Sequence, residues 1–539
     1  MNFALWVDGG VILFYFVLIV GIGLYAGRNN TTLQEFALGG HKIPWWAVLA
    51  SIIAAETSAA TFLGTPGEGY KDRSFAYAQL AIGTIIARVI IAYLFIAPYF
   101  KHKVQSIYEF LTVRFGPRTK DMASGIFLLS RVLGIGVRLY LGGVILVVIW
   151  RYLLPGQEVT VWTYFWGIVF ITVVTTFYTA VGGIKAVIWT DLIQACLMIG
   201  AAIFAVFTIF FHIPGGWQTI SEKLSGQDIS MFRTGWDATK PFGEALKGML
   251  ENPYTIFAAI VGSTFFTMAT HGTDQDMVQR MLTAENPQKS RLSLIVSGFA
   301  DIPIVLAFLV VGILLWVYYQ VNHDPSLPKV TNEIFAHYIV HSMPIGIRGL
   351  IIAGVFATMM GSTSAALNAL ATSFIRDFYQ PYINPAASDR RAVRAARIAT
   401  AVFGLLMIVV ATAVAYAALK TNVTIIPLAI GILGYGYGAI LGVFLLGVLT
   451  EDRGNDIANI FGMLLGIAAV LILAKIQIPL YDDPATGSVF KFSFGGFMPD
   501  WWPAISWPYF VLIGCSVTFT FSILFASKKV IAPQSQLPA

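Results

Sequence analysis

Apolar segments of about 20 residues alternate with short polar connections along almost the whole chain. As an α-helix, a segment of that length crosses a hydrocarbon layer roughly 30 Å thick. We predict thirteen such spans, which leave no room for a soluble domain. The predicted spans cover residues 9–27, 44–69, 75–99, 120–150, 160–181, 186–212, 253–278, 290–320, 346–375, 394–419, 423–449, 456–476 and 504–526.

The second predicted span differs from the others because polar residues interrupt it twice. Glu56, Thr57 and Ser58 stand halfway along it, and the sequence GTPG follows at 64–67. A carboxylate and unpaired backbone carbonyls are costly in hydrocarbon unless they line a wet cavity or bind a cation. A broken helix at this depth therefore predicts a transport site. The alternative is a kink in which Glu56 pairs with a basic neighbour.

The seventh predicted span is interrupted in a similar way. Its core reads TFFTMATHGTDQDMVQR, with Thr267, Thr270 and His271 before Asp274. Each interrupted span opens a set of five, and five is odd, so the second set must be inverted relative to the first. We predict one transmembrane domain, 1–539, that consists of an extra span at 9–27, repeats at 44–213 and 253–450, and C-terminal spans at 456–526.

Composition agrees with a membrane protein. Hydrophobic residues make up 57% of the 539 residues, charged residues only 12%, and the mean hydropathy is +0.75, which excludes the soluble globular classes. The net charge of +6 comes largely from short loops, so it indicates orientation in the bilayer and not nucleic-acid binding.

Charge in the connections predicts an N-terminus outside and a C-terminus in the cytoplasm. The first segment lacks a basic flank and a cleavage site, so we expect a retained span in a multi-pass protein of the plasma (inner) membrane. The basic residues assigned to the cytoplasmic side are Arg28, Lys42, Lys101, Lys103, Arg114, Arg118, Lys120, Lys185, Arg280, Lys289, Arg291, Arg390, Arg391, Arg394, Arg397, Lys528 and Lys529.

Two segments outside the spans are predicted to lie at the outer face. Ile334, Phe335, Tyr338 and Ile339 follow helical spacing, which indicates a short amphipathic helix within 326–345. This helix either covers the outer mouth or packs on its neighbours with no gating role. The loop at 477–503, rich in Pro, Gly and aromatic residues, is expected to form an outer cap.

Several stretches together resemble the sodium/solute symporter family, which includes sodium-coupled carriers of sugars, proline, iodide, vitamins and monocarboxylates. The signature-like stretches are GGIKAVIWTDLIQ (182–194) and GTDQDMVQR (272–280), joined by SAATFLGTPGEGY (58–70), GSTSAALNALAT (361–372) and YGAILGVFLLGVL (437–449). The resemblance implies an all-α, LeuT-type inverted repeat of five plus five spans, with one extra span before and two after. It also implies secondary active transport, in which sodium moves inward with a small polar organic solute.

A sodium site is implied by the same resemblance. It would consist of the backbone carbonyls of Ala54, Thr57 and Thr358 and the hydroxyl of Ser362. Sodium is a hard cation that favours oxygen ligands, and a broken helix frees backbone carbonyls. Gly361 stands where family members usually carry a second hydroxyl, so one side-chain ligand is missing.

The missing ligand has several possible substitutes, namely the Thr57 hydroxyl, the Glu56 carboxylate or water, and a coupling ion other than sodium stays open. Asp191 resembles an acidic residue that the family places near the ion path. Alternatively, the Asp191 carboxylate is structural: it lies at a helix N-terminus, where the helix dipole and free amides stabilise it and Thr190 forms part of the cap.

The solute cavity implied by the alignment would be lined by Thr61, Gln79, Thr267, Thr270 and His271. Hydroxyl, amide and imidazole groups suit a polar solute, although each threonine can instead bond to its own helix. No Arg or Lys falls at an obvious solute-facing position, so sugar, small carboxylate or vitamin, and amino acid all stay open.

Glu56 has two possible roles. It either faces the cavity, where it neutralises the ion, accepts a proton or binds the solute, or it turns away to pair with Arg131 or Arg138. Those two arginines lie seven residues apart on one face of the fourth span.

Two rival functions fit the chain less well. A channel on the same scaffold would need a ring of charged or carbonyl-rich filter residues, and none is evident. An enzyme or sensor would need metal-ligand spacing, a nucleophile motif or a signalling domain. We therefore expect no enzymatic cofactor, and as partners only sodium, the solute and the bilayer, with no nucleic acid and no obligatory protein partner.

Overall fold

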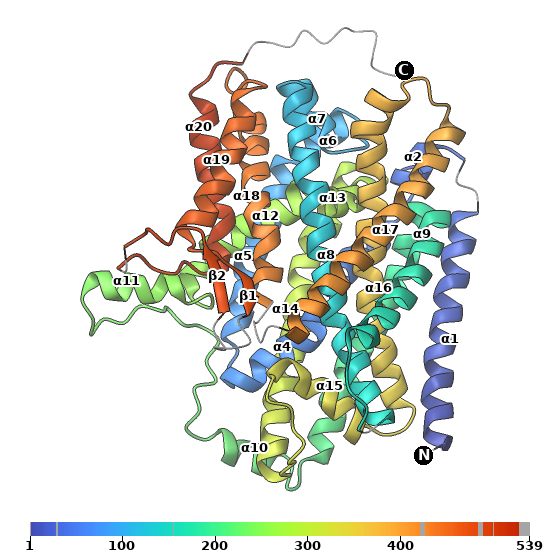
Figure 1. Cartoon of the computed structure of the whole chain (residues 1–539), viewed down its shortest axis with the longest axis vertical. Coiled ribbons are helices and arrows are strands. Elements are labelled where there is room, and N and C mark those ends of the chain that lie inside the picture. The colour runs from blue at the N-terminus through green and yellow to red at the C-terminus, as the bar shows by residue number, and fades with distance from the viewer. Residues whose placement is uncertain are drawn as a thin grey trace.

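Long helices run along one direction, and the connections collect at the two ends of the molecule (Figure 1). This computed structural model describes residues 2–28, 31–154, 156–420, 426–482, 489–499 and 501–527. Lys528 and Lys529, the first residues of the eleventh predicted span (423–425) and part of the predicted cap (483–488 and 500) lie outside the described residues.

The first half of the chain is almost entirely helical. It forms α1 (Asn2–Gly27), α2 (Leu33–Leu38), α3 (Trp45–Glu56), α4 (Ala59–Asp72), η1 (Ala76–Gln79), α5 (Leu80–Leu94), α6 (Ile96–Lys101), α7 (Glu109–Arg114), α8 (Pro117–Leu153), α9 (Val161–His212), α10 (Trp217–Leu224) and α11 (Phe242–Glu251).

The second half adds further helices and one small hairpin. Its elements are η2 (Ala258–Ser263), α12 (Thr264–Gly272), α13 (Gln275–Leu282), α14 (Pro287–Val321), α15 (Thr331–Ser342), α16 (Ile347–Ser373), η3 (Phe374–Ile383), α17 (Asp389–Lys420), α18 (Ile426–Leu449), α19 (Ala458–Leu473), β1 (Gln477–Asp482), β2 (Val489–Ser493), η4 (Trp507–Tyr509) and α20 (Phe510–Ile523). The antiparallel hairpin of β1 and β2 lies within the predicted outer cap.

Every predicted span falls on helical structure. Seven helices of the described chain are long and apolar enough to cross a membrane, or eight if the bent pair α3 and α4 is one span. Shorter apolar helices occupy the positions of the last three predicted spans. The count of thirteen stays a prediction.

The fifth and sixth predicted spans meet inside α9, at Gly183. This residue has φ 55° and ψ −152°, a conformation that glycine adopts without steric cost. A Cβ atom there would lie 2.6 Å from the Phe36 carbonyl oxygen. Glycine therefore lets the chain turn between two spans while α2 packs closely against it.

The predicted break in the second span is present. Helix α3 ends at Glu56, Thr57 has an extended backbone (φ −81°, ψ 91°), and α4 starts at Ala59. The two helical segments, Trp45–Glu56 and Thr61–Asp72, are bent by 59° relative to each other.

The second interruption, GTPG, lies instead inside α4, which continues through Pro66. Gly67 within it and Gly69 just after it serve close packing. A Cβ on Gly67 would lie 2.6 Å from Asn332 Oδ1, and a Cβ on Gly69 would lie 2.5 Å from the Leu309 carbonyl oxygen. Helices α14 and α15 thus approach the α4 backbone directly.

The seventh span is broken between α12 and α13. Helix α12 ends at Gly272, and Asp274 caps α13 by accepting the backbone N–H of Asp276 at 2.8 Å. A π-helical segment, η2, precedes α12.

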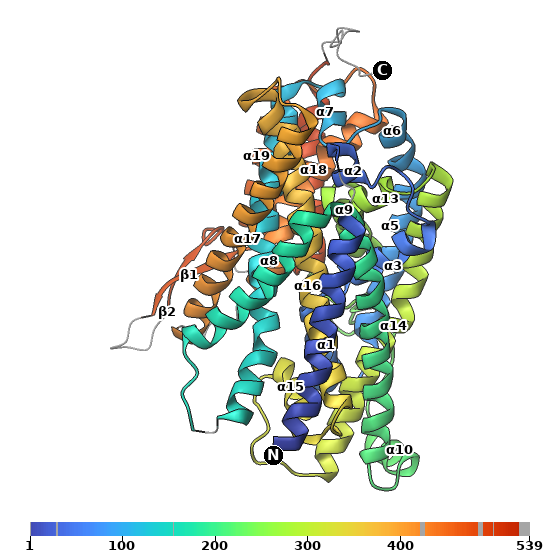
Figure 2. The same cartoon turned by 90° about the vertical axis from the view of Figure 1, so that its right-hand side faces the viewer.

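Helix α16 forms the centre of the bundle. Its apolar window is 94% buried, compared with 22% for the peripheral α1, and both views show it among neighbouring helices (Figures 1 and 2). The chain starts at the end of the molecule that carries α10 and α15, whereas α2, α6 and α7 lie at the opposite end.

The amphipathic helix predicted within 326–345 is α15. Its apolar stripe, Ile334, Phe335, Tyr338 and Ile339, is buried against the bundle, where α15 packs on α4 and α8. A gating role for this helix stays a prediction.

Candidate functional site

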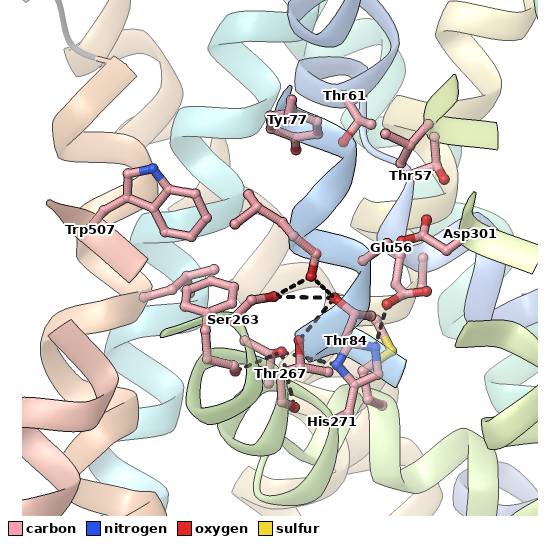
Figure 3. Close-up of a pocket in the computed structure, with 18 of the residues that line it drawn as sticks. Glu56, Thr57, Thr61, Tyr77, Thr84, Ser263, Thr267, His271, Asp301 and Trp507 are labelled. Atoms are coloured by element: carbon pink, nitrogen blue, oxygen red, sulfur yellow. Dashed lines mark hydrogen bonds and ion pairs between the residues drawn. The ribbon is translucent and has the colours of Figure 1, made fainter. Parts of the chain in front are cut away.

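A cavity of about 210 Å³ lies beside the break between α3 and α4. Its lining includes Glu56, Thr57, Thr61 and Asp301 on one side and Trp507 on the other (Figure 3). A second cavity of about 310 Å³ continues toward α15. The two cavities share Thr61, Tyr77, Arg138, Phe266, Leu433 and Trp507.

Glu56 faces the first cavity and is paired with a basic residue. Its Oε1 forms an ion pair with the fully buried Arg88 of α5 and lies 2.6 Å from His271 Nε2 of α12. Its Oε2 has no hydrogen-bond partner among the described residues. The structure thus pairs Glu56 with Arg88 and not with Arg131 or Arg138, the two partners considered from the sequence.

Two further charged side chains line this cavity without a partner. Arg138 of α8 lines both cavities, and neither its guanidinium nor the Asp301 carboxylate of α14 forms a hydrogen bond or ion pair with any residue that the structure describes. An arginine therefore lines the candidate cavity, although none was expected at an obvious solute-facing position. Helix α8 turns its Arg131 and Arg138 toward the break, a rotation that hydropathy does not specify.

The predicted polar residues divide into two groups. Thr61, Thr267, Thr270 and His271 line the first cavity. Thr270 also bonds to its own helix, at 3.1 Å from the Phe266 carbonyl oxygen. Gln79 is outside the lining of both cavities, and its Nε2 donates to the Tyr254 carbonyl oxygen at 2.7 Å.

The break frees a backbone carbonyl at the position expected for sodium. In a continuous helix the Ser58 N–H would bond to the Ala54 carbonyl, but here it bonds to the Glu56 carbonyl at 3.0 Å. The Ala54 oxygen then points to α16, since it lies 3.6 Å from the position of a Cβ on Gly361.

Two more oxygens surround Gly361. A Cβ there would lie 2.8 Å from Gln194 Oε1 and 3.5 Å from Asp191 Oδ1, both from α9. Neither of these buried oxygens has a hydrogen-bond partner among the described residues. A buried polar atom without a partner calls for an explanation such as a bound ion or water, and three oxygens around one position suit a cation.

Thr358 and Ser362 lie on the same part of α16. The Ser362 hydroxyl donates to the Thr358 carbonyl at 3.0 Å, which leaves its lone pairs available as a ligand. The Thr358 hydroxyl donates to the Val355 carbonyl at 2.8 Å. Both residues are buried, since Thr358 is 3% exposed and Ser362 is 4% exposed.

Comparison with known proteins identifies the chain. The model of the sodium:solute symporter family matches residues 36–466. The chain belongs to this family. The symporter is 30% identical to the sodium/sialic acid symporter SiaT of Proteus mirabilis, over 86% of this chain and 89% of the relative. It is 28% identical to the sodium-coupled monocarboxylate transporter 2 of Bos taurus, over 90% of this chain and 75% of the relative.

The fold of the symporter is also that of a solved relative. A substrate-bound, outward-open Na⁺-coupled sialic acid symporter superimposes with a TM-score of 0.78, at 25% identity, over 97% of this chain and 99% of the other. Sodium-coupled uptake of a solute by a predominantly helical, LeuT-type membrane transporter is thereby confirmed, with Na⁺ as the coupling ion.

Asp191 of the symporter belongs to a buried network of charges. Its Oδ2 accepts hydrogen bonds from Ser51 at 2.6 Å and from Arg280 at 3.0 Å. Arg280 also pairs with Asp276, which in turn pairs with Arg131. The network holds the Asp191 carboxylate so that its other oxygen, Oδ1, faces Gly361. The predicted Thr190 cap is not formed, because that hydroxyl donates to the Ala186 carbonyl.

Sequence reasoning missed Arg88, Asp301 and Gln194. A signal existed for the first two, because a charged residue inside an apolar span is rare and marks a functional site. Arg88 lies in the third predicted span and Asp301 in the eighth. Gln194 ends a signature-like stretch, but only the packing of α9 on α16 reveals where its oxygen lies.

Proposed function

We propose that the solute carries a carboxylate and that Arg138 binds it. The supporting observation is a guanidinium that lines both cavities and lacks a counter-ion among the described residues. An arginine fork matches a carboxylate with two parallel hydrogen bonds. Arg88, in contrast, is already paired with Glu56.

The rest of the lining suits a small solute with hydroxyl groups. Thr61, Thr84, Ser263 and Thr267 offer hydroxyls, and Trp507 offers an apolar face. Cavities of about 210 and 310 Å³ lie at or below the lower end of the usual range for ligand sites, which favours a compact molecule. The sialic acid and monocarboxylate carriers named above are both carriers of acids, which supports a carboxylate over a neutral sugar.

For sodium, we propose a site between the break and α16. Its oxygens are the carbonyls of Ala54, Thr57 and Thr358 and the hydroxyl of Ser362. Asp191 Oδ1 and Gln194 Oε1 would replace the hydroxyl that Gly361 lacks. Glu56 is a weaker substitute, because Arg88 and His271 already engage its carboxylate.

Alternating access follows from this geometry. Sodium would tie the broken span to α16 in the outward-open state, and solute binding beside the same break would permit closure and inward opening. A coupling of about 1 to 3 kcal/mol between the two ligands changes affinity by 5- to 150-fold. The placement of basic residues supports an N-terminus outside and a C-terminus in the cytoplasm of a plasma (inner) membrane.

Uptake into proteoliposomes tests the solute proposal. A panel of sialic acid, a short monocarboxylate, glucose and proline, each with and without a sodium gradient, should show saturable uptake of an acid that collapses without the gradient. Arg138→Gln should abolish this uptake, because its loss leaves the solute carboxylate unpaired. Arg151→Gln, which removes an exposed charge from the same helix, is the matched control.

Two outcomes would contradict the proposal. Equal uptake of the acid by Arg138→Gln and by the Arg151→Gln control would remove Arg138 from the site. Preferred uptake of glucose would exclude a carboxylate as the recognised group. An ohmic current without solute would point to the rival channel.

A further inference from the structure

A groove on the outer surface of the bundle separates η3 from α17. Its volume is about 530 Å³, and nothing in the transport site contributes to it. Its walls are apolar along most of their length, with Phe374 on one side and Ile398, Val402 and Leu406 on the other. The Phe374 and Phe403 rings meet edge to face, with centroids 6.1 Å apart.

Local structure explains why the groove exists. Segment η3 is a π-helix with Pro381 inside it, so its path differs from that of a regular α-helix. A small apolar cluster that includes Ala392 and Ala396 joins α17 to η3 and α2 on the inner side. The outer side stays open, and Ile398 is 58% exposed there.

One end of the groove is strongly basic. Arg391 and Arg394 are three residues apart, so they share a face of α17, and both line the groove. Neither forms an ion pair or hydrogen bond with any residue in the described part of the chain. Tyr379 lies at the same end and adds a phenol group.

The dimensions match one leaflet of a bilayer. Along α17, the distance from Arg391 to Leu406 is about 22 Å, at roughly 1.5 Å per residue. The basic end lies at the end of the molecule where α2 packs against α17 (Figure 2). The apolar walls therefore extend from the headgroup level toward the middle of a hydrocarbon layer roughly 30 Å thick.

We propose that this groove binds an anionic phospholipid. Arg391 and Arg394 bind its phosphate, and one acyl chain lies along the apolar walls. Charge complementarity decides the occupant: two unpaired guanidinium groups favour an anionic headgroup, and basic pockets between membrane helices are suited to such lipids. A zwitterionic lipid would fill the walls equally well, but the cationic group of its headgroup would offset the negative charge that its phosphate brings to the arginines.

Lipid retention on the purified full chain tests the proposal. The protein is exchanged into detergent with equal amounts of phosphatidylglycerol and phosphatidylcholine, and the bound lipid is measured by native mass spectrometry. The wild type should retain phosphatidylglycerol selectively. The double variant Arg391→Gln/Arg394→Gln should lose about thirtyfold in relative retention, at about fivefold per arginine.

The matched control is Arg390→Gln/Arg397→Gln, which removes the same charge from the same helix outside the groove lining. It should retain phosphatidylglycerol like the wild type. A third variant, Val402→Trp, fills the groove without changing charge, at a side chain that is already 49% exposed, and should reduce retention of the lipid.

Four results would overturn the proposal. The wild type could show no preference for phosphatidylglycerol, the two double variants could lose it equally, or Val402→Trp could retain it fully. Inorganic phosphate at millimolar concentration should not displace the lipid, and displacement would show an anion site without a role for the acyl chain. None of these results depends on the identity of the transported solute.

Discussion

The Gly361 region offers the sharpest test of the sodium site. If Gln194 Oε1 replaces the missing hydroxyl, Gln194→Ala removes one sodium ligand and leaves the rest of the site in place. A hydrogen bond to a charged group contributes about 1.5 to 3 kcal/mol, and we take an oxygen ligand to sodium as comparable. The sodium concentration for half-maximal uptake should then rise by about ten- to a hundredfold.

A second substitution should restore the sodium affinity that Gln194→Ala removes. A Cβ on Gly361 would lie 2.8 Å from Gln194 Oε1, whereas ordinary contacts begin at 3.4 Å. In the wild-type background, Gly361→Ser therefore displaces the glutamine oxygen while it adds a hydroxyl. With Gln194→Ala the space is open, so the double variant should regain sodium affinity close to that of the wild type.

The assay is uptake into proteoliposomes as a function of sodium concentration at saturating solute. Gln279→Leu serves as the control, because this glutamine is equally buried, has an Oε1 without a partner, and bonds through Nε2 to the Ala37 carbonyl on α2. Two results would refute the reasoning: an unchanged sodium dependence in Gln194→Ala, or purely additive effects in the double variant.

Three further predictions follow. Ser362→Ala should raise the sodium concentration for half-maximal uptake. Thermal stability without sodium should change little, since the lost hydroxyl donates only within its own helix. Equal sodium dependence in the wild type and in Ser362→Ala would remove Ser362 from the site. Glu56→Gln should destabilise the protein by about 3 to 5 kcal/mol, because it leaves the fully buried Arg88 without its counter-ion, and the double change to Glu56→Gln with Arg88→Gln should recover part of that loss in thermal unfolding. Hydrogen bonds from Ser326 and His337 lower the pKa of Asp324 to about 2, so its contribution is present above pH about 4 and lost as the pH falls toward 2. The difference in melting temperature between wild type and Asp324→Asn should therefore shrink as the pH falls from 4 toward 2.

The sequence was a good guide to the spans and to the two breaks. Hydropathy locates a span because every backbone polar group in lipid must be satisfied within a helix. Glu56 and Asp274 marked the breaks for the same reason, since polar residues at that depth need a special environment. The GTPG stretch was misread as a break, because Gly67 and the adjacent Gly69 serve tight packing of α4 on α15 and α14, which a single sequence does not reveal.

Ion pairs between helices that are distant in the sequence could not be predicted from the sequence. Arg131 and Arg138 lie seven residues apart on one face of α8, yet Arg131 is paired with Asp274 and Asp276 while Arg138 faces the cavity. The true partner of Glu56 comes from α5. The rotation of each helix about its axis decides such pairs, and apolar composition on all sides of a span leaves that rotation unspecified.

Charge balance in the site leads to a prediction about stoichiometry. The charged side chains that line the first cavity, together with those joined to them through consecutive ion pairs, comprise five carboxylates and four guanidinium groups. The carboxylates belong to Glu56, Asp191, Asp274, Asp276 and Asp301, and the guanidinium groups to Arg88, Arg131, Arg138 and Arg280.

At their usual charges, and with His271 neutral, these groups leave one net negative charge, which one sodium ion cancels. An anionic solute restores the negative charge in a medium where unbalanced charge is costly, so a second cation should enter with it. Flux of radioactive sodium and solute, measured in parallel, should give about two sodium ions for each acid, with inward current. A ratio of one to one for an acidic solute, with no proton uptake, would show that the charge count misrepresents the transported state.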